Sequence, residues 1–204
     1  MDAAGGLVAP RDRTIDGVHL TEAVLRSLRE RYGAPEALRW EGEVSGQEFA
    51  LAGSSPARRH DVTFFVFDAH DRLALIQKPS YPPEVWRPPG GGVRPEERFE
   101  DGVQREALEE LGVEIALERF LVSTEATFRC LGEAIEWRTL VFSASTSADV
   151  LDPRDTREIA AARWGTTTEL AGPLRAAMLE TGRALWRYRV ALHDTAIQQL
   201  EQLG

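Results

Sequence analysis

One stretch of fixed spacing, residues 91–113, constrains this 204-residue chain more than any other feature. Its specified positions are, in order, Gly91, Glu97, Arg105, Glu106, Ala107 (an aliphatic position), Glu109, Glu110, Gly112 and Val113. So many residue types at set distances make this pattern far more specific than a short glycine motif. The second half of the stretch also has the periodicity of a helix.

A helix is predicted from Phe99 to Leu111, because apolar side chains recur at every fourth position and form one stripe. Arg98 occupies the position before the helix, where Ser, Thr or Asp is more usual. Gly112 follows the last apolar position and favours a left-handed helix end. Gly102 inside the helix costs about 1 kcal/mol relative to alanine, so we expect a neighbouring segment to pack closely against it.

Three carboxylates lie on one side of this helix, because Glu106 is three residues from Glu109 and four from Glu110. Crowded carboxylates repel one another, and a hard divalent cation such as Mg²⁺ removes that conflict through oxygen ligands. Arg105 lies four residues before Glu109 and can pair with it or with Glu97. An exposed acidic helix face is the alternative, which the glutamates alone do not exclude.

The complete pattern resembles the signature of the Nudix hydrolases, and a looser resemblance extends over residues 58–170. The resemblance implies an α/β fold, namely a Nudix-type α/β/α sandwich with a central mixed sheet. It also implies an enzyme that hydrolyses phosphoric anhydrides, cleaving a nucleoside diphosphate linked to another moiety with Mg²⁺ (or Mn²⁺) as cofactor. The alternative is a non-catalytic Nudix domain that senses a ligand. Such domains usually lose carboxylates of the pattern, and this sequence retains all of them.

The resemblance further implies roles for individual residues. The implied metal ligands are Glu106, Glu109, Glu110 and the backbone carbonyl of Gly90. In several family members a carboxylate before a late Trp-containing strand joins the metals or acts as general base, and Glu158 is the matching residue. The candidate catalytic residues are Glu106, Glu109, Arg105 and Glu158, with the general base left open among the three glutamates. The residues expected to orient or shape the site are Arg105, Glu97, Gly91 and Gly112.

Residues 78–92 are predicted to form a loop rich in proline and glycine, which lets the backbone approach a ligand closely. Lys78 and Arg87 are candidate substrate contacts through phosphate, and the alternative is that both are solvated loop charges. Trp86 is a candidate for stacking on a base or ring, and the alternative is that it packs against the underside of the helix.

The best linker, Gly53 to Pro56, divides the chain into an N-terminal extension (residues 1–57) and a Nudix domain with C-terminal helices (residues 58–204). In the extension we predict a helix over residues 20–32. A hairpin of two strands, 38–45 and 48–51, is predicted to follow it. In Nudix proteins such extensions often serve dimerisation or substrate selection, so the resemblance implies a homodimer as one expectation. The alternative is that the extension only covers a sheet edge.

The second part of the chain is predicted to alternate strands and loops before it becomes helical. The predicted strands are residues 61–67, 73–77, 113–116, 121–128 and 134–145. Helices are predicted from Thr168 onward, with a break near Gly182. We expect Trp137 to pack on a sheet face. The basic and aromatic residues 187–189 are attributed to ion pairs with neighbouring acids rather than to nucleic-acid binding.

The formal net charge of −9 argues against nonspecific binding to nucleic acid or an anionic membrane, because those partners require a basic face. The negative net charge does not exclude a small nucleotide substrate, because a bound metal reverses the sign of the local electrostatic field. No apolar run approaches the ~20 residues needed to span a bilayer, and residues 1–10 resemble a frayed terminus more than a signal peptide. The single cysteine, Cys130, fits a reducing cytoplasm, and the four histidines lack the spacing of a zinc site.

The substrate stays open at this level. Family members that cleave ADP-ribose carry a proline downstream of the pattern, and those that cleave dinucleoside polyphosphates carry a tyrosine nearby. Residues 127–131 show neither mark. Nucleoside diphosphate sugars, ADP-ribose-like compounds and nucleoside triphosphates therefore remain candidates. A prenyl diphosphate isomerase would need a catalytic cysteine, for which Cys130 lacks the surroundings, and a transcription regulator would need an added DNA-binding domain.

Overall fold

The described part of the chain, residues 20–54 and 59–203 of a computed structural model, is a sheet with helices on both faces. In chain order the helices and strands are α1 (Glu22–Tyr32), β1 (Glu36–Glu43), α2 (Gly46–Gly53), β2 (His60–Phe67), β3 (Leu73–Gln77), α3 (Phe99–Glu110), β4 (Ala116–Cys130), β5 (Glu133–Ser145), β6 (Ala161–Gly165), α4 (Thr167–Glu169), a π-helical turn η1 (Leu170–Leu174), α5 (Arg175–Glu180) and α6 (Ala184–Leu203).

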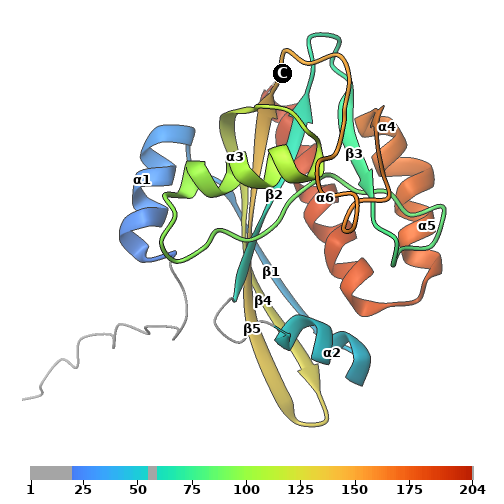
Figure 1. Cartoon of the computed structure of the whole chain (residues 1–204). Coiled ribbons are helices and arrows are strands. Elements are labelled where there is room, and N and C mark those ends of the chain that lie inside the picture. Colours follow the sequence, from blue (N-terminus) through green and yellow to red (C-terminus); the bar gives the residue numbers. More distant parts are fainter. Residues whose placement is uncertain (1–19, 55–58, 204) are drawn as a thin grey trace, which may run out of the picture.

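Within the described residues the sheet has six strands in the order β1-β4-β5-β2-β3-β6. β1 runs parallel to β4, and β2 runs parallel to β5. The remaining neighbours are antiparallel, so the sheet is mixed, as predicted. β4 and β5 are the longest strands, and their hairpin extends beyond the rest of the sheet (Figure 1).

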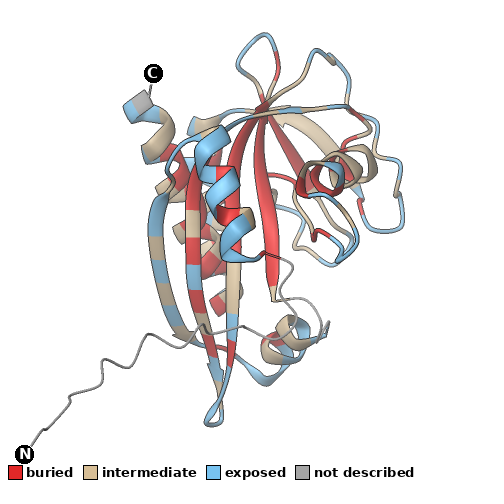
Figure 2. Cartoon of the chain, turned by 90° about the vertical axis from the view of Figure 1, so that its left-hand side faces the viewer, coloured by how far each residue is buried: buried red, intermediate tan, exposed pale blue. Residues whose placement is uncertain are grey.

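Two apolar layers attach the helices to the sheet, one on each face. Val103 and Ala107 of α3 belong to the core that also contains Leu25 of α1. Leu192 and Ala196 of α6 belong to the core on the opposite face. Figure 1 shows α1 and α3 on one side of the sheet and α4, α5 and α6 on the other, and Figure 2 shows buried residues concentrated in the strands between them. The predicted α/β/α sandwich is therefore confirmed.

The predicted hairpin before residue 57 is wrong. Residues 46–53 form helix α2, because Ser45 accepts a hydrogen bond from the Glu48 backbone while the Glu48 carboxylate accepts one from the Ser45 backbone. This reciprocal capping box favours a helix over a second strand. The first predicted strand exists as β1, but its partner is β4.

The boundary at residue 57 stays a prediction, and the linker residues 55 and 56, like residues 1–19, lie outside the described residues.

Most of the other predicted elements are confirmed. Thr21 caps α1, and α3 ends one residue before the predicted position. The predicted strand at 113–116 is wrong, since β4 begins only at Ala116. The C-terminal helices break at Thr181 and Gly182, as predicted, and Cys130 is a half-buried strand residue.

None of the helices in the described ranges is long and apolar enough to cross a membrane.

Candidate active site

The glycine-rich loop lies directly beside strand β2. The Val62 backbone N–H donates to the Gly91 carbonyl at 2.8 Å, and the Phe64 N–H donates to the Pro89 carbonyl at 3.0 Å. A Cβ atom on Gly90 would lie 2.1 Å from the Val62 backbone oxygen, so the approach requires glycine. The loop is therefore fixed to the centre of the sheet.

Helix α3 places two carboxylates on this loop. The Gly92 N–H donates to Glu106 Oε1 at 3.2 Å, and the Gly90 N–H donates to Glu110 Oε2 at 2.6 Å. A Cβ atom on Gly91 would lie 2.1 Å from Glu106 Oε2, so this glycine leaves room for the carboxylate. Burial raises the pKa of Glu106, and the neighbouring Arg105 guanidinium offsets part of that rise.

Arg105 connects the acidic residues of the site with one another. Its guanidinium donates to Glu97 at 2.7 Å, to Glu106 at 2.9 Å, to Glu109 at 2.9 Å and to the Gly92 carbonyl at 2.8 Å. The sequence left its partner open between Glu97 and Glu109, and the structure shows both. The hydrogen bond from Arg105 is the main cause that lowers the pKa of Glu97.

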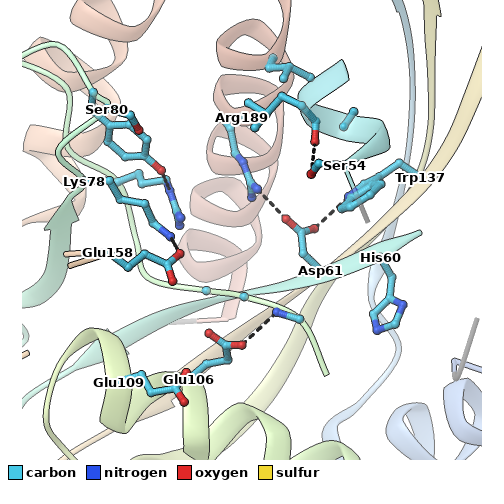
Figure 3. A pocket seen from close by; sticks show the side chains of 18 of the residues that line it. Ser54, His60, Asp61, Lys78, Ser80, Glu106, Glu109, Trp137, Glu158 and Arg189 are labelled. Carbon is cyan, nitrogen blue, oxygen red and sulfur yellow. Dashed lines mark hydrogen bonds and ion pairs between the residues drawn. The ribbon is translucent and has the colours of Figure 1, made fainter. Parts of the chain in front are cut away.

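Lys78 connects Glu110 with Glu158. Its Nζ lies 3.0 Å from Glu110 Oε1, and it also pairs with the Glu158 carboxylate (Figure 3). Burial alone would lower the pKa of Lys78, but the Glu110 charge, together with Tyr81 and the hydrogen bond to Glu158, outweighs burial and raises the pKa. Glu158, which precedes β6 as the resemblance implied, is thereby brought to the same site.

A cleft of about 1070 Å³ runs from these carboxylates to helix α6. The predicted site residues that line it are Lys78, Arg87, Gly90, Gly91, Arg105, Glu106, Glu109 and Glu158. Arg87 is only 4% exposed and donates to the Tyr81 hydroxyl at 2.7 Å and to the Pro88 carbonyl at 2.7 Å. It is therefore a buried part of the wall rather than a solvated loop charge.

Four predicted residues lie outside the cleft lining, namely Glu110, which is buried behind Lys78, and Trp86, Glu97 and Gly112. Trp86 packs against the core beside α6, with the Arg163 guanidinium 4.6 Å from its ring. Glu97 lies behind Arg105. Gly112 has φ of 74° and ends α3 where a Cβ would lie 1.9 Å from the Asp152 carbonyl oxygen. The predicted left-handed helix end is thus confirmed.

The far end of the cleft contains a polar network that the sequence did not single out. Asp61 accepts hydrogen bonds from Trp137 Nε1 at 3.1 Å and from the Thr139 hydroxyl at 2.5 Å, and it pairs with Arg189 at 2.5 Å (Figure 3). The Tyr188 hydroxyl lies 2.6 Å from the Thr139 hydroxyl, and burial raises the pKa of Tyr188. In the segment 187–189, Tyr188 is buried and Arg189 pairs with an acid as predicted, whereas Arg187 is exposed and donates to the Gly182 carbonyl instead.

The donor chemistry at α3 fits a hard divalent cation. Carboxylate and carbonyl oxygens are the ligands that Mg²⁺ prefers. Glu110 Oε1 is buried, and the Lys78 ammonium lies 3.0 Å from it without an aligned hydrogen bond, so this oxygen can offer a lone pair to a metal that displaces Lys78. Among residues 20–54 and 59–203, no group of three or more Asp, Glu, His or Cys side chains is already arranged to hold a metal ion. Glu109 is held by Arg105 and Glu110 by Lys78.

A match over residues 57–185 identifies the family of this chain. The model of the NUDIX domain matches residues 57–185, which is more than half of the chain, and the chain therefore belongs to the Nudix family. The predicted class, a hydrolase acting on phosphoric anhydride bonds, is confirmed at that level. Helix α1, strand β1 and helix α2 precede the matched region.

Several solved structures have a similar fold. A NUDIX-family hydrolase from Clostridium perfringens is 21% identical over 55% of this chain and 84% of that chain, with a TM-score of 0.42. A MutT protein from Methanosarcina mazei Go1 is 19% identical over 70% and 93%, with a TM-score of 0.48. An Ap4A hydrolase from C. elegans is 19% identical over 66% and 97%, with a TM-score of 0.43. No curated protein matches this chain.

Proposed function

We propose that this protein is a metal-dependent pyrophosphohydrolase that cleaves a nucleoside diphosphate linked to another moiety. The observation that carries the proposal is that two α3 carboxylates, Glu106 and Glu110, accept hydrogen bonds from the backbone of the glycine loop, and that Glu106 lines a large cleft. This arrangement supports metal binding because carboxylate oxygens, which suit a hard divalent cation, lie beside the loop that carries the Gly90 carbonyl.

The residues that would hold Mg²⁺ or Mn²⁺ are Glu106, Glu109, Glu110 and the Gly90 carbonyl. A bound metal would neutralise the phosphate charge and lower the pKa of the attacking water. Arg105 keeps Glu106 and Glu109 in place through its hydrogen bonds. One of Glu106, Glu109 and Glu158 takes the proton from the water, and a kinetic comparison of their glutamine variants identifies which one.

The cleft is richer in cations than the chain as a whole. The basic side chains that line it are Lys78, Arg87, Arg94, Arg105, Arg157, Arg183 and Arg189. Five acids line the cleft as well (Asp61, Glu106, Glu109, Asp155 and Glu158), so the lining carries a formal charge of +2 in a chain with a formal net charge of −9, and this favours an anionic ligand. The half-buried side chains of Trp137 and Leu185 line the far end and offer apolar surface to the linked moiety.

A hydrolysis screen tests the proposal. The purified chain is incubated with Mg²⁺ or Mn²⁺ and nucleoside diphosphate derivatives, beside Glu109→Gln and the exposed control Glu118→Gln. We expect metal-dependent turnover of one compound class, retained in the control and reduced at least a hundredfold in Glu109→Gln. If metal changes neither turnover nor ligand binding, the hydrolase proposal fails. Metal-independent ligand binding without turnover would support the sensing domain instead.

We also propose that the protein is a cytoplasmic homodimer. Light scattering of the full chain tests whether it forms a homodimer through residues before 57. A cytoplasmic location is supported by the single, half-buried Cys130 and is tested by cell fractionation.

A further inference from the structure

Lys78 is the only lysine in a chain whose other 23 basic residues are arginines. Its ammonium lies between Glu110, a proposed metal ligand, and Glu158. We propose that Lys78 is an exchangeable counter-ion of Glu110. It neutralises the carboxylate before metal binds, and it turns into the cleft towards substrate phosphate when metal takes its place. This inference rests on the proposed function and assigns Lys78 a positioning role within it.

The first argument is the burial of Glu110. Its side chain is 3% exposed, one oxygen accepts the Gly90 N–H at 2.6 Å, and the other accepts no hydrogen bond. A buried carboxylate is strongly unfavourable without an opposite charge nearby. Lys78 Nζ, 3.0 Å from the second oxygen, is the one cation paired with Glu110 in the described part of the chain. Lys78 and a metal ion therefore compete for the same oxygen.

The second argument is the contrast between Lys78 and Arg105. The planar guanidinium of Arg105 contacts Glu97, Glu106 and the Gly92 carbonyl among others, and leaving that position would break all of these contacts. The ammonium of Lys78, on its flexible four-carbon chain, can move away from a Glu110 oxygen without breaking the paired hydrogen bonds that a planar guanidinium would make. Arginine thus occupies the fixed position and lysine the exchangeable one.

The third argument is the second contact of Lys78. Glu158 is 59% exposed and lies on the loop that precedes β6, at the wall of the cleft. An ammonium released from Glu110 keeps Glu158 as its partner, so its charge stays beside the space that a diphosphate would enter (Figure 3). Metal binding and phosphate binding are then coupled, since the first frees the cation that serves the second.

The first test measures Mn²⁺ affinity by the electron paramagnetic resonance of free Mn²⁺. The proteins are the parent, Lys78→Met and the matched control Arg157→Met. Arg157 is 94% exposed, lines the same cleft and, among the residues that the structure describes, forms an ion pair with Asp155 alone, so its removal takes away one positive charge without freeing Glu110. We expect Lys78→Met to bind Mn²⁺ at least about fivefold more tightly than the parent, and Arg157→Met to stay within about twofold of it.

The second test uses the parent chain, so it does not depend on folding of a variant. Growth on [¹³C]lysine labels one residue, and its ε-carbon signal is followed during a Mg²⁺ titration. We expect this signal to shift and to saturate together with metal binding. Metal binding with an unchanged Lys78 signal and equal affinity in Lys78→Met would overturn the inference and leave the proposed function intact. A parent chain that binds no metal would overturn both.

Discussion

Arg189 Nη2 of helix α6 lies 2.5 Å from Asp61 Oδ2 at the start of strand β2. The Asp61 side chain is 9% exposed, whereas that of Arg189 is 21% exposed. Burial alone would raise the pKa of Asp61, but the Arg189 charge and the hydrogen bonds from Thr139 and Trp137 outweigh it and lower the pKa. The pair connects the helix that closes the far end of the cleft to the sheet.

Removal of either partner is expected to have unequal effects. Arg189→Met leaves a buried carboxylate without a counter-charge and is expected to cost about 3 kcal/mol of unfolding free energy. Asp61→Asn leaves the more exposed Arg189 unpaired and is expected to cost about half as much. Urea unfolding followed by tryptophan fluorescence measures both, with the exposed Arg187→Met as control. A cost for Asp61→Asn equal to that for Arg189→Met would contradict this interpretation.

The same pair predicts a dependence on pH. Because the folded pKa of Asp61 is lowered, its stabilising contribution is present above the unfolded pKa of about 3.9 and is lost as the pH falls through the folded value. The stability difference between the parent and Asp61→Asn should therefore be constant near neutral pH and shrink below about pH 4. Urea unfolding at a series of pH values checks this, and a difference that grows on acidification would refute it.

The glycine loop offers two alanine substitutions with opposite outcomes. In Gly91→Ala the new methyl group meets the mobile end of Glu106, so the carboxylate moves while the fold survives. We expect a stability change under about 1 kcal/mol and a loss of ten- to a hundredfold in Mn²⁺ affinity. In Gly90→Ala the methyl group meets the Val62 backbone oxygen, and we expect a cost of about 3 kcal/mol. Thermal unfolding and Mn²⁺ titration separate the two, and the interpretation fails if Gly91→Ala binds Mn²⁺ like the parent.

Glu48 is expected to stabilise more than its own helix. One of its oxygens closes the α2 capping box with Ser45, and the other accepts the Leu185 N–H at 2.9 Å in the first turn of α6. Ser45→Ala removes the cap of α2 alone and should cost about 1 kcal/mol. Glu48→Ala also leaves the Leu185 N–H unsatisfied and should cost about 2 kcal/mol or more. Equal unfolding midpoints for the two variants would show that the contact with α6 contributes nothing.

The sequence predicted the parts of the site that depend on local spacing. Glu106, Glu109 and Glu110 share a helix, so their common side follows from helical geometry, and Arg105 on the same helix necessarily lies among them. Helix α2 was predictable in principle, because Ser45 and Glu48 have capping-box spacing, but the short apolar run after Glu48 favoured a strand.

Other relationships have no local signal. Asp61 and Arg189 are 128 residues apart, and nothing in the neighbourhood of either indicates the other. Lys78 was predicted to contact phosphate, but its contact with Glu110 depends on how the loop returns to α3. The partner of β1 was equally unpredictable, since a strand sequence specifies a face more readily than a neighbour.

The pairing of β1 with β4 has a consequence for synthesis of the chain. Glu36 leaves the ribosome well before its partner Val122, and at ordinary translation rates the delay is on the order of ten seconds. Through that interval the nascent β1 segment has no neighbouring strand, and Glu48 waits still longer for Leu185. Strand β1 can therefore enter the sheet only after β4 has been synthesised, and the contact between α2 and α6 can form only later still.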